Sequence, residues 1–223
     1  MRIGVIGAGR IGGNIAERWS AAGHEVVLSF SRSPERLAEQ AASMGTRAVS
    51  PAEAAAFGEV VLLSVPWPAL DAALEQAGSL AGRLVVDTTN PFGPDGLVTF
   101  ADGRTAAQTN AARLVGARYA KAFNTLTSAF QRAVGADPER VLAMFYASDD
   151  DGAAAMTHEL VATCGFVPTR LPWSRVALLE APRRDGAVYG EEYRPQDAAR
   201  IAEAATTDPS AAARLAVELR RAD

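Results

Sequence analysis

Short apolar runs alternate with amphipathic stretches along the first part of the chain. Four runs with apolar centres lie at residues 2–6, 25–29, 60–65 and 83–87, and the run at 60–65 is the most continuous. Continuous runs of this kind are typical of parallel strands that are covered on both faces. Helical periodicity between them predicts helices after residue 11 and at residues 35–43, 51–57 and 69–77. We therefore predict a doubly wound, mostly parallel sheet of the α/β class, with right-handed crossovers.

The second part of the chain continues this alternation less regularly. Its predicted elements are a helix at 105–115, strands at 119–123 and 141–146, a helix that ends near 163, and a strand at 166–171. Three acidic residues, Asp149, Asp150 and Asp151, precede the second of these helices. Acidic residues favour a helix N-terminus, and the triplet lacks the alternating spacing of a calcium loop. We interpret it as a helix cap rather than a metal site.

The last part of the chain, residues 172–223, shows no strand pattern. Alanine-rich helices are predicted at about 195–205 and 209–221. The sequence therefore predicts a sheet domain over residues 1–171, followed at 172–223 by a C-terminal segment of loop and helices. We expect this segment to pack on the core or on a partner subunit.

A glycine-rich segment directly follows the first predicted strand. It reads Gly7-Ala8-Gly9-Arg10-Ile11-Gly12 and leads into a helix with an apolar stripe of Ile11, Ile15 and Trp19. In such a turn the first glycine allows the tight bend, the second lets the backbone approach a pyrophosphate, and the third allows close helix packing. The free N–H groups at the helix start favour a bound anion. The motif in this context predicts a Rossmann-like, dinucleotide-binding domain.

The end of the second strand indicates which dinucleotide binds. NAD-specific sites usually carry Asp or Glu about 20 residues beyond the glycines, but here the residue is Arg32, with Ser29, Ser31 and Ser33 around it. A guanidinium with neighbouring hydroxyls suits a 2′-phosphate dianion. The same segment also fits a solvated turn in which Ser33 caps the next helix and Pro34 begins it. The two interpretations are compatible, and we predict NADP(H) as the cofactor.

Composition and charge narrow the class of protein. Of the 223 residues, 48% are hydrophobic, and the net charge is −4. The arginines are scattered, which argues against nucleic acid as a partner. Cys164 is the single cysteine, so a reducing compartment is expected. No apolar run approaches the length of a membrane span, and the first strand begins at the N-terminus. We expect a cytoplasmic protein that binds neither membranes nor nucleic acid.

The usual catalytic side chains are scarce in this sequence. His24 lies in a helix-to-strand turn and His158 on the acid-capped helix, and structural or solvated roles are expected for both. The G-x-S-x-G, H-E-x-x-H and C-x-x-C motifs are absent. What remains is a set of loops at the carboxyl ends of successive strands, where ligands bind in open parallel sheets. These loops are residues 7–12, 29–32, 64–67, 88–92 and 124–125. Hydride transfer can use such a site because the cofactor supplies the reactive bond.

These loops resemble those of a known family. The segments that carry the resemblance are Ile6 to Gly12, Ser31-Arg32, Ser64-Val65-Pro66-Trp67, Asp87-Thr88-Thr89-Asn90-Pro91 and Lys121-Ala122-Phe123-Asn124-Thr125. Together they look like the NADP-dependent reductases of the deazaflavin coenzyme F-420. That group also contains dinucleotide-binding reductases with unassigned substrates. The resemblance extends from residue 1 to about residue 180.

The resemblance implies an NADPH-dependent oxidoreductase in which a hydride passes directly between the nicotinamide and a flavin-like or deazaflavin (F-420) cosubstrate. No catalytic side chain and no metal are then expected. The phosphates of NADP would lie at Arg10, Ile11, Ser31, Arg32 and Arg36, and the nicotinamide at Val65, Pro66, Ala122 and Asn124. With Gly7, Gly9, Gly12 and Asn90 these complete the expected cofactor-binding residues. The resemblance and the strand-free tail together predict a homodimer.

The chain departs from these relatives near its end. Deazaflavin reductases close with a largely apolar helical segment, whereas residues 180–193 are a polar loop here, with Tyr189 and Tyr193 either over a cleft or on the surface. The hydride acceptor therefore stays open among F-420, a flavin, and a small carbonyl or imine compound. In the last case Lys121 or Tyr189 would supply a proton. A non-catalytic NADP-binding sensor or scaffold is a further alternative, because acid–base residues are few.

Overall fold

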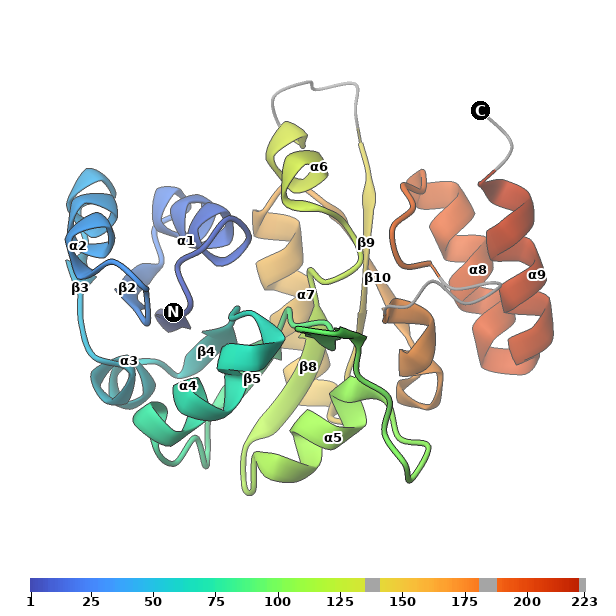
Figure 1. Ribbon diagram of the computed structural model, residues 1–223. Helices are drawn as coiled ribbons and strands as arrows, with labels where there is room; N and C mark the ends of the chain where they lie inside the picture. Colours follow the sequence, from blue (N-terminus) through green and yellow to red (C-terminus); the bar gives the residue numbers. More distant parts are fainter. Residues whose placement is uncertain (135–140, 181–187, 221–223) are drawn as a thin grey trace.

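Eight strands form one sheet in the computed structural model, in the order β10-β9-β8-β5-β4-β1-β2-β3 (Figure 1). The structure describes residues 1–134, 141–180 and 188–220. The strands are β1 (Arg2–Ile6), β2 (Glu25–Ser29), β3 (Arg47–Ala48), β4 (Val60–Leu63), β5 (Leu84–Asp87), β8 (Arg118–Ala122), β9 (Ala143–Ala147) and β10 (Val167–Leu171). The six strands from β3 to β8 are parallel, while β9 pairs with β8 in the antiparallel direction. The strand order reverses between β1 and β4, so the predicted doubly wound, mostly parallel sheet is confirmed.

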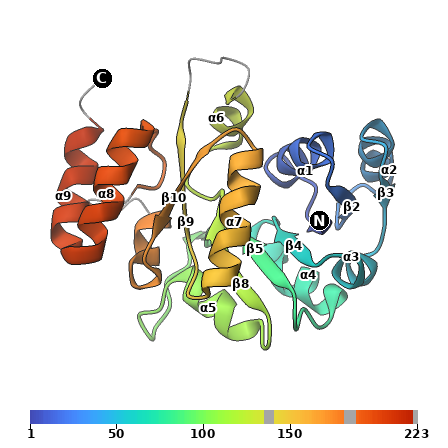
Figure 2. The ribbon, with the colours of Figure 1, turned by 180° about the vertical axis from the view of Figure 1, so that it is seen from behind.

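Helices cover both faces of this sheet (Figures 1 and 2). One face carries α1 (Gly12–Ala21), α2 (Pro34–Ser43) and α7 (Asp151–Thr163), and the other carries α3 (Pro51–Phe57), α4 (Leu70–Ala77) and α5 (Ala106–Arg113). An apolar cluster lies on each face of the sheet, and successive residues of β4 alternate between the two clusters. Val60 and Leu62 pack toward the first face and Val61 and Leu63 toward the second. Alternate strand residues point to opposite faces, so a continuous apolar run serves both layers.

Two of the helix starts have the predicted structural roles. Ser33 caps α2 with Pro34 as its first residue, as predicted, and Ser50 forms a capping box with Glu53 at α3, which was not predicted. The Asp150 side chain accepts a hydrogen bond from the Ala153 N–H at 2.5 Å, which confirms that the acidic triplet caps α7. Capping of this kind satisfies N–H groups that the first helical turn leaves without partners.

Several short elements differ from the sequence-based expectation. Strand β4 ends at Leu63, two residues early, because the chain turns into the 3-10 helix η1 (Trp67–Ala69) at Pro66, which has no N–H to donate. The loop at 88–102 contains a hairpin of β6 (Phe92–Gly93) and β7 (Gly96–Leu97). Two further elements were not predicted, namely α6 (Ser128–Ala133) and the 3-10 helix η2 (Trp173–Leu179). Both are too short for a clear periodic pattern.

The C-terminal helices α8 (Pro195–Thr207) and α9 (Pro209–Leu219) lie side by side beyond β9 and β10 (Figures 1 and 2). Ile201 of α8 and Ala216 of α9 are fully buried in the apolar cluster on the α3–α5 face. Tyr193 precedes them, and only 3% of it is exposed, with its ring against Phe145 and its hydroxyl bonded to the Ala216 carbonyl. Packing on the core was one of the two expectations for this segment, and Tyr193 serves that packing rather than covering a cleft.

Candidate functional site

A cleft of about 570 Å³ opens at the carboxyl ends of the parallel strands. All five predicted loops contribute to it, together with Leu126, Thr127, Tyr189 and Gly190. Of the residues expected to bind the cofactor, those that line the cleft are Gly9, Arg10, Ile11, Arg32, Val65, Pro66, Asn90 and Asn124. The other five, Gly7, Gly12, Ser31, Arg36 and Ala122, are not among the lining residues.

The three glycines of the turn meet different surroundings. Gly7 has a φ of 103°, and a Cβ on it would lie 2.3 Å from the Ser64 carbonyl oxygen. A Cβ on Gly12 would lie 2.1 Å from the Gly7 carbonyl oxygen, so the close contact of Gly12 is with the turn itself and with Ser64. Nothing lies within 4 Å of the Cβ position on Gly9. Gly7 and Gly12 allow the turn to close, whereas Gly9 leaves open space on the side of the cleft.

The first helix starts without a side-chain cap, as α4 and α8 do. Ile11 is the N-cap residue of α1 and makes no side-chain capping bond, whereas Ser33, Ser50, Thr105 and Asp150 cap α2, α3, α5 and α7. The α1 terminus adjoins the cleft through Gly9, Arg10 and Ile11. A helix start without a side-chain cap, at the edge of a cleft, suits a bound anion such as a pyrophosphate.

Two arginines give this end of the cleft positive charge. Arg10 and Arg32 both line it, and both side chains are solvent-exposed. Phe30, two residues before Arg32, has a φ of 57°, and this left-handed residue turns the chain as it leaves β2. Ser31 accepts a hydrogen bond from the Ser33 N–H at 3.2 Å, and Arg36 lies exposed on α2. The structure therefore places Arg32 at the cleft, while Ser31 and Arg36 lie at its margin.

At the other end, two asparagines join neighbouring loops. The Asn90 Nδ2 group donates to the Asn124 carbonyl at 3.0 Å, and the Asn124 Nδ2 group donates to Asn90 Oδ1 at 3.2 Å. Phe123, with a φ of 59°, turns the chain after β8 and so places Asn124 at the cleft. Ala122 is fully buried in the sheet, because β8 continues to this residue, and it has no surface on the cleft.

Three aromatic side chains line the cleft near these asparagines. They are Trp67, Phe92 and Tyr189, which come from η1, β6 and the C-terminal segment. The rings of Phe92 and Tyr189 lie 6.4 Å apart between centroids, and Trp67 meets Phe100 edge-on at 5.8 Å. Burial raises the pKa of Tyr189, so its hydroxyl stays protonated at neutral pH. Of the two alternatives for Tyr189, a cleft position is the one observed.

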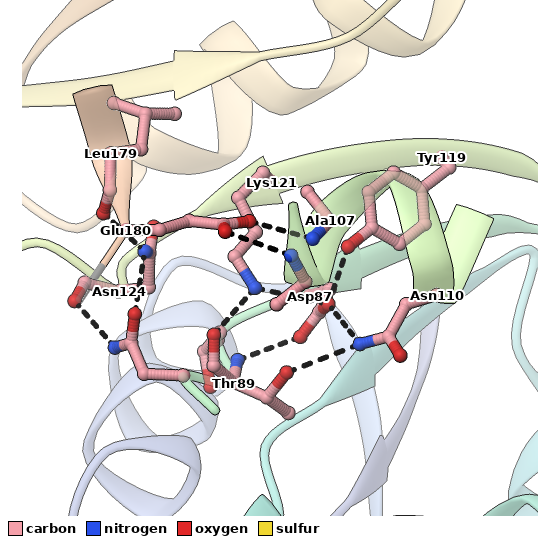
Figure 3. A network of polar contacts seen from close by, with 12 residues as sticks. Asp87, Thr89, Ala107, Asn110, Tyr119, Lys121, Asn124, Leu179 and Glu180 are labelled. Carbon is pink, nitrogen blue, oxygen red and sulfur yellow. Dashed lines mark hydrogen bonds and ion pairs between the residues drawn. The ribbon is translucent and has the colours of Figure 1, made fainter. Parts of the chain in front are cut away.

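Behind the cleft floor, a network of polar side chains is enclosed in the protein (Figure 3). Lys121 and Asp87 are completely buried, with Lys121 Nζ 3.1 Å from Asp87 Oδ2. Asp87 also accepts hydrogen bonds from the Tyr119 hydroxyl, Asn110 Nδ2 and the Thr89 N–H. Burial works to raise the pKa of Asp87, but the Lys121 charge and these hydrogen bonds outweigh it and hold the pKa below its usual value. Burial and the Asp87 charge raise the pKa of Tyr119 well above its usual value.

The buried position of Lys121 corrects one sequence-based alternative. Its ammonium bonds to Asp87 and to the Thr89 carbonyl, and none of the side chain is exposed. It is not among the residues that line the cleft, so Tyr189 is the better placed of the two proposed proton donors. Its position within the predicted strand at 119–123 gave no indication of a partner, because Asp87 lies 34 residues away in sequence.

Glu180 is a further buried acid, and it was not predicted from the sequence. Its two carboxylate oxygens accept hydrogen bonds from the Ala106 and Ala107 N–H groups at 2.9 and 2.6 Å, which joins it to the start of α5. Burial raises the pKa of Glu180, against the opposing attraction of Lys121 and the two amides. Its partners are 73 and 74 residues away, and no local sequence pattern predicts such a pairing.

Neither a metal centre nor a membrane span is found among the described residues. No group of three or more His, Cys, Asp or Glu side chains is arranged to hold a metal ion in that part of the chain. Within the same residues, every helix is too short or too polar to cross a bilayer.

The first part of the chain matches a family model. Residues 2–91 fit the family described as "NADP oxidoreductase coenzyme F420-dependent", which confirms the resemblance over that range. The match contains the glycine turn, the Arg32 loop, and the loops after β4 and β5. No curated protein matches the chain.

Solved structures extend the similarity to most of the fold. A hypothetical protein from Sinorhizobium meliloti is 27% identical, with a TM-score of 0.75 over 86% of this chain and 95% of that one. A candidate F-420-dependent NADP reductase from Arthrobacter sp. FB24 is 24% identical, with a TM-score of 0.68 over 79% of this chain and 87% of that one.

A reductive aminase from Aspergillus terreus, in complex with NADPH and ethyl levulinate, is 20% identical, with a TM-score of 0.57 over 77% of this chain and 54% of that one. This last likeness concerns the fold alone. The chain therefore has a Rossmann-like fold, and its residues 2–91 are similar to NADP-dependent oxidoreductases.

Proposed function

We propose that the protein transfers a hydride between NADP(H) and a planar, flavin-like or deazaflavin (F-420) cosubstrate. The observation that carries the proposal is the polarity of the cleft. Arginines and an uncapped helix start lie at one end, and three aromatic side chains lie at the other. A phosphate-rich cofactor fits the first end, and a flat conjugated ring fits the second because aromatic side chains favour offset or edge contacts with other rings.

The residues present fit NADP without further groups. Bound NADPH supplies the hydride and its two electrons. The open space at Gly9 admits a pyrophosphate, the α1 N–H groups and Arg10 bind it, and Arg32 binds the 2′-phosphate. Val65, Pro66 and Asn124 border the nicotinamide. The acceptor ring then lies between the nicotinamide and the Phe92–Tyr189 pair, and alignment of the two rings is the main contribution of the protein.

The test is turnover with defined acceptors. Purified protein is mixed with NADPH and F-420, FMN or FAD, and the nicotinamide absorbance is followed. We expect NADPH oxidation with at least one of them, and deuterium at the transferable position of NADPH should appear in reduced deazaflavin if transfer is direct. Stable absorbance with all three acceptors would count against the proposal.

The position of Tyr189 favours a second candidate, reduction of a small carbonyl or imine compound. Its hydroxyl is protonated and lies at the cleft wall. There it would give a proton to the carbonyl oxygen or imine nitrogen, while the carbon bonded to that atom receives the hydride. Tyr189→Phe keeps the ring and removes this proton. A loss of about a hundredfold or more in kcat would support the carbonyl or imine reaction, whereas direct transfer to a deazaflavin predicts little change.

We also propose a homodimer in solution. The proposal rests on the family resemblance and on the helical C-terminal segment, of which the helices α8 and α9 end the described chain. Light scattering coupled to size-exclusion chromatography measures the mass. Twice the chain mass is expected, and a monomeric mass would contradict the proposal.

A further inference from the structure

Three consecutive residues at the end of η2 make three different long-range connections. The Leu178 carbonyl accepts a hydrogen bond from the Val188 N–H at 2.9 Å. The Leu179 carbonyl accepts one from Asn124 Nδ2 at 2.6 Å, and the Glu180 carboxylate accepts two from the start of α5. Figure 3 shows Leu179 and Glu180 side by side, reaching Asn124 and Ala107 respectively. We call residues 178–180 the junction.

The junction also fixes the chain on either side of Tyr189. Val188, which is fully buried, bonds to it directly, and the Gly190 N–H donates to the Thr125 carbonyl at 2.7 Å. Thr125 adjoins Asn124, whose side chain is bonded to Leu179. Tyr189 therefore lies between two anchored residues, and its ring contacts Phe92, which also lines the cleft. A shift of Tyr189 would change the aromatic surface at the acceptor end.

Glu180 is the one residue of the junction that connects through its side chain. Leu178 and Leu179 connect through backbone carbonyls, which a substitution does not remove. Two short hydrogen bonds run from the first N–H groups of α5 to the two oxygens of this buried carboxyl group, and these N–H groups have no partner within the helix. The contact ties the C-terminal segment to α5, whose start follows the loop that leads from the cleft.

We propose that Glu180 is a positioning residue that sets acceptor specificity, by holding the junction and so the place of Tyr189 opposite Phe92. This inference rests on the proposed function for its catalytic consequence. Glu180 itself does not touch the cleft, since it is absent from the lining. The NADPH phosphates bind at the opposite end of the cleft, so we expect Glu180 to have little effect on NADPH affinity. The acceptor KM depends on it.

The experiment compares Glu180→Gln with Glu75→Gln. Both changes remove one negative charge, but Glu75 is exposed on α4, away from the cleft. Glutamine keeps the size of Glu180, while its amide nitrogen cannot accept the second N–H bond. We expect Glu180→Gln to raise the acceptor KM on the order of tenfold, with the NADPH dissociation constant and kcat within about twofold. Glu75→Gln should change none of the three.

Two more measurements separate positioning from general loosening. Amide hydrogen exchange at residues 188–190 should accelerate in Glu180→Gln, while exchange in β1 and α1 stays as in the wild type. In a double-mutant cycle, Tyr189→Ala should raise the acceptor KM in the wild-type background and add little in the Glu180→Gln background. Additive effects, or an equal loss of NADPH affinity, would overturn the proposal. If the wild type fails to oxidise NADPH with any of the three acceptors, the proposed function fails. Unchanged amide exchange at residues 188–190 would separately overturn the positioning role.

Discussion

Lys121 and Asp87 form an ion pair with no exposed surface, 3.1 Å between Nζ and Oδ2, on adjacent strands beneath the cleft. The pair also fixes the loop that follows β5, because Lys121 bonds to the Thr89 carbonyl and Asp87 accepts from the Thr89 N–H. Thr89 lines the cleft. A buried charge keeps its place only where partners compensate its lost hydration. The pair is thus a structural support for the cleft floor.

Removal of one partner should therefore lower the free energy of unfolding. Lys121→Met leaves Asp87 buried without its counter-charge, and we expect the free energy of unfolding to fall by about 3–5 kcal/mol. Urea unfolding followed by circular dichroism measures this change. The double variant Lys121→Met/Asp87→Asn is the control, and it should lose less than the single variant, because no uncompensated charge remains. If Lys121→Met has wild-type stability and loses only kcat, the result would contradict the structural role and support proton donation by Lys121.

The glycine turn provides a pair of variants with opposite expected results. In Gly12→Ala the new methyl would lie 2.1 Å from the Gly7 carbonyl oxygen, so we expect a loss of about 1–3 kcal/mol or more in unfolding free energy. In Gly9→Ala the methyl meets nothing within 4 Å. Its stability should stay within about 0.5 kcal/mol of the wild type.

The same Gly9→Ala variant should bind NADPH more weakly, on the order of tenfold in dissociation constant, because the methyl occupies the approach of the pyrophosphate. Thermal unfolding and a fluorescence titration with NADPH distinguish the two effects. Wild-type NADPH affinity in Gly9→Ala would show that the pyrophosphate does not lie against this residue.

The alternating part of the chain was predictable because its signals are local. The first two strands have the predicted bounds, and helix α3 does as well, since Ser50 and Pro51 mark its start within the sequence. The common edge of the five loops also followed from the sequence, because parallel strands place their carboxyl ends together. These inferences needed neither side-chain partners nor distant contacts.

The parts that were missed depend on pairs far apart in the chain. Glu180 bonds to α5 across more than seventy residues, and Asp87 meets Lys121 across 34. Helix α6 has only six residues, and its buried Gln131 bonds to the Phe123 and Leu126 carbonyls, so its inward face is polar. A periodic apolar pattern cannot reveal such a helix. Ala122 was assigned to the cleft by resemblance, whereas the continued strand buries it.

The two buried acids should respond to pH in opposite directions. The pKa of Glu180 is raised by burial above its ordinary 4.5, so the folded state holds this proton more tightly than the unfolded state. Its stabilising contribution is complete below pH 4.5 and is lost as the pH rises through the folded-state pKa. For Asp87 the folded-state pKa lies below its ordinary 3.8, and stability is lost only as the pH falls below that value.

Urea unfolding at a series of pH values from 4.5 upward can therefore isolate Glu180. The unfolding free energy of the wild type relative to Glu180→Gln should decrease as the pH rises, because only the wild type must ionise a buried carboxyl. Glu75→Gln, which replaces an exposed carboxyl group on α4, is unfolded at the same pH values as the matched variant. A difference that grows with pH would mean that the amides and Lys121 outweigh burial at Glu180.

We expect cofactor choice to depend on one of two arginines that lie four residues apart. Arg32 lines the cleft and Arg36 does not, although both are exposed and both follow β2. Arg32→Asp replaces a donor to the 2′-phosphate with a like charge, and we expect the NADPH dissociation constant to rise about 10- to 100-fold while that for NADH changes little. Arg36→Asp makes the same change in net charge, so it controls for long-range electrostatics, and its effect should be several times smaller.

Fluorescence titrations at two salt concentrations measure both variants, because a general charge effect weakens with salt and a direct contact persists. Equal losses for the two variants would assign the preference to the field of the whole segment, and unchanged NADPH affinity in Arg32→Asp would remove the 2′-phosphate from this end of the cleft.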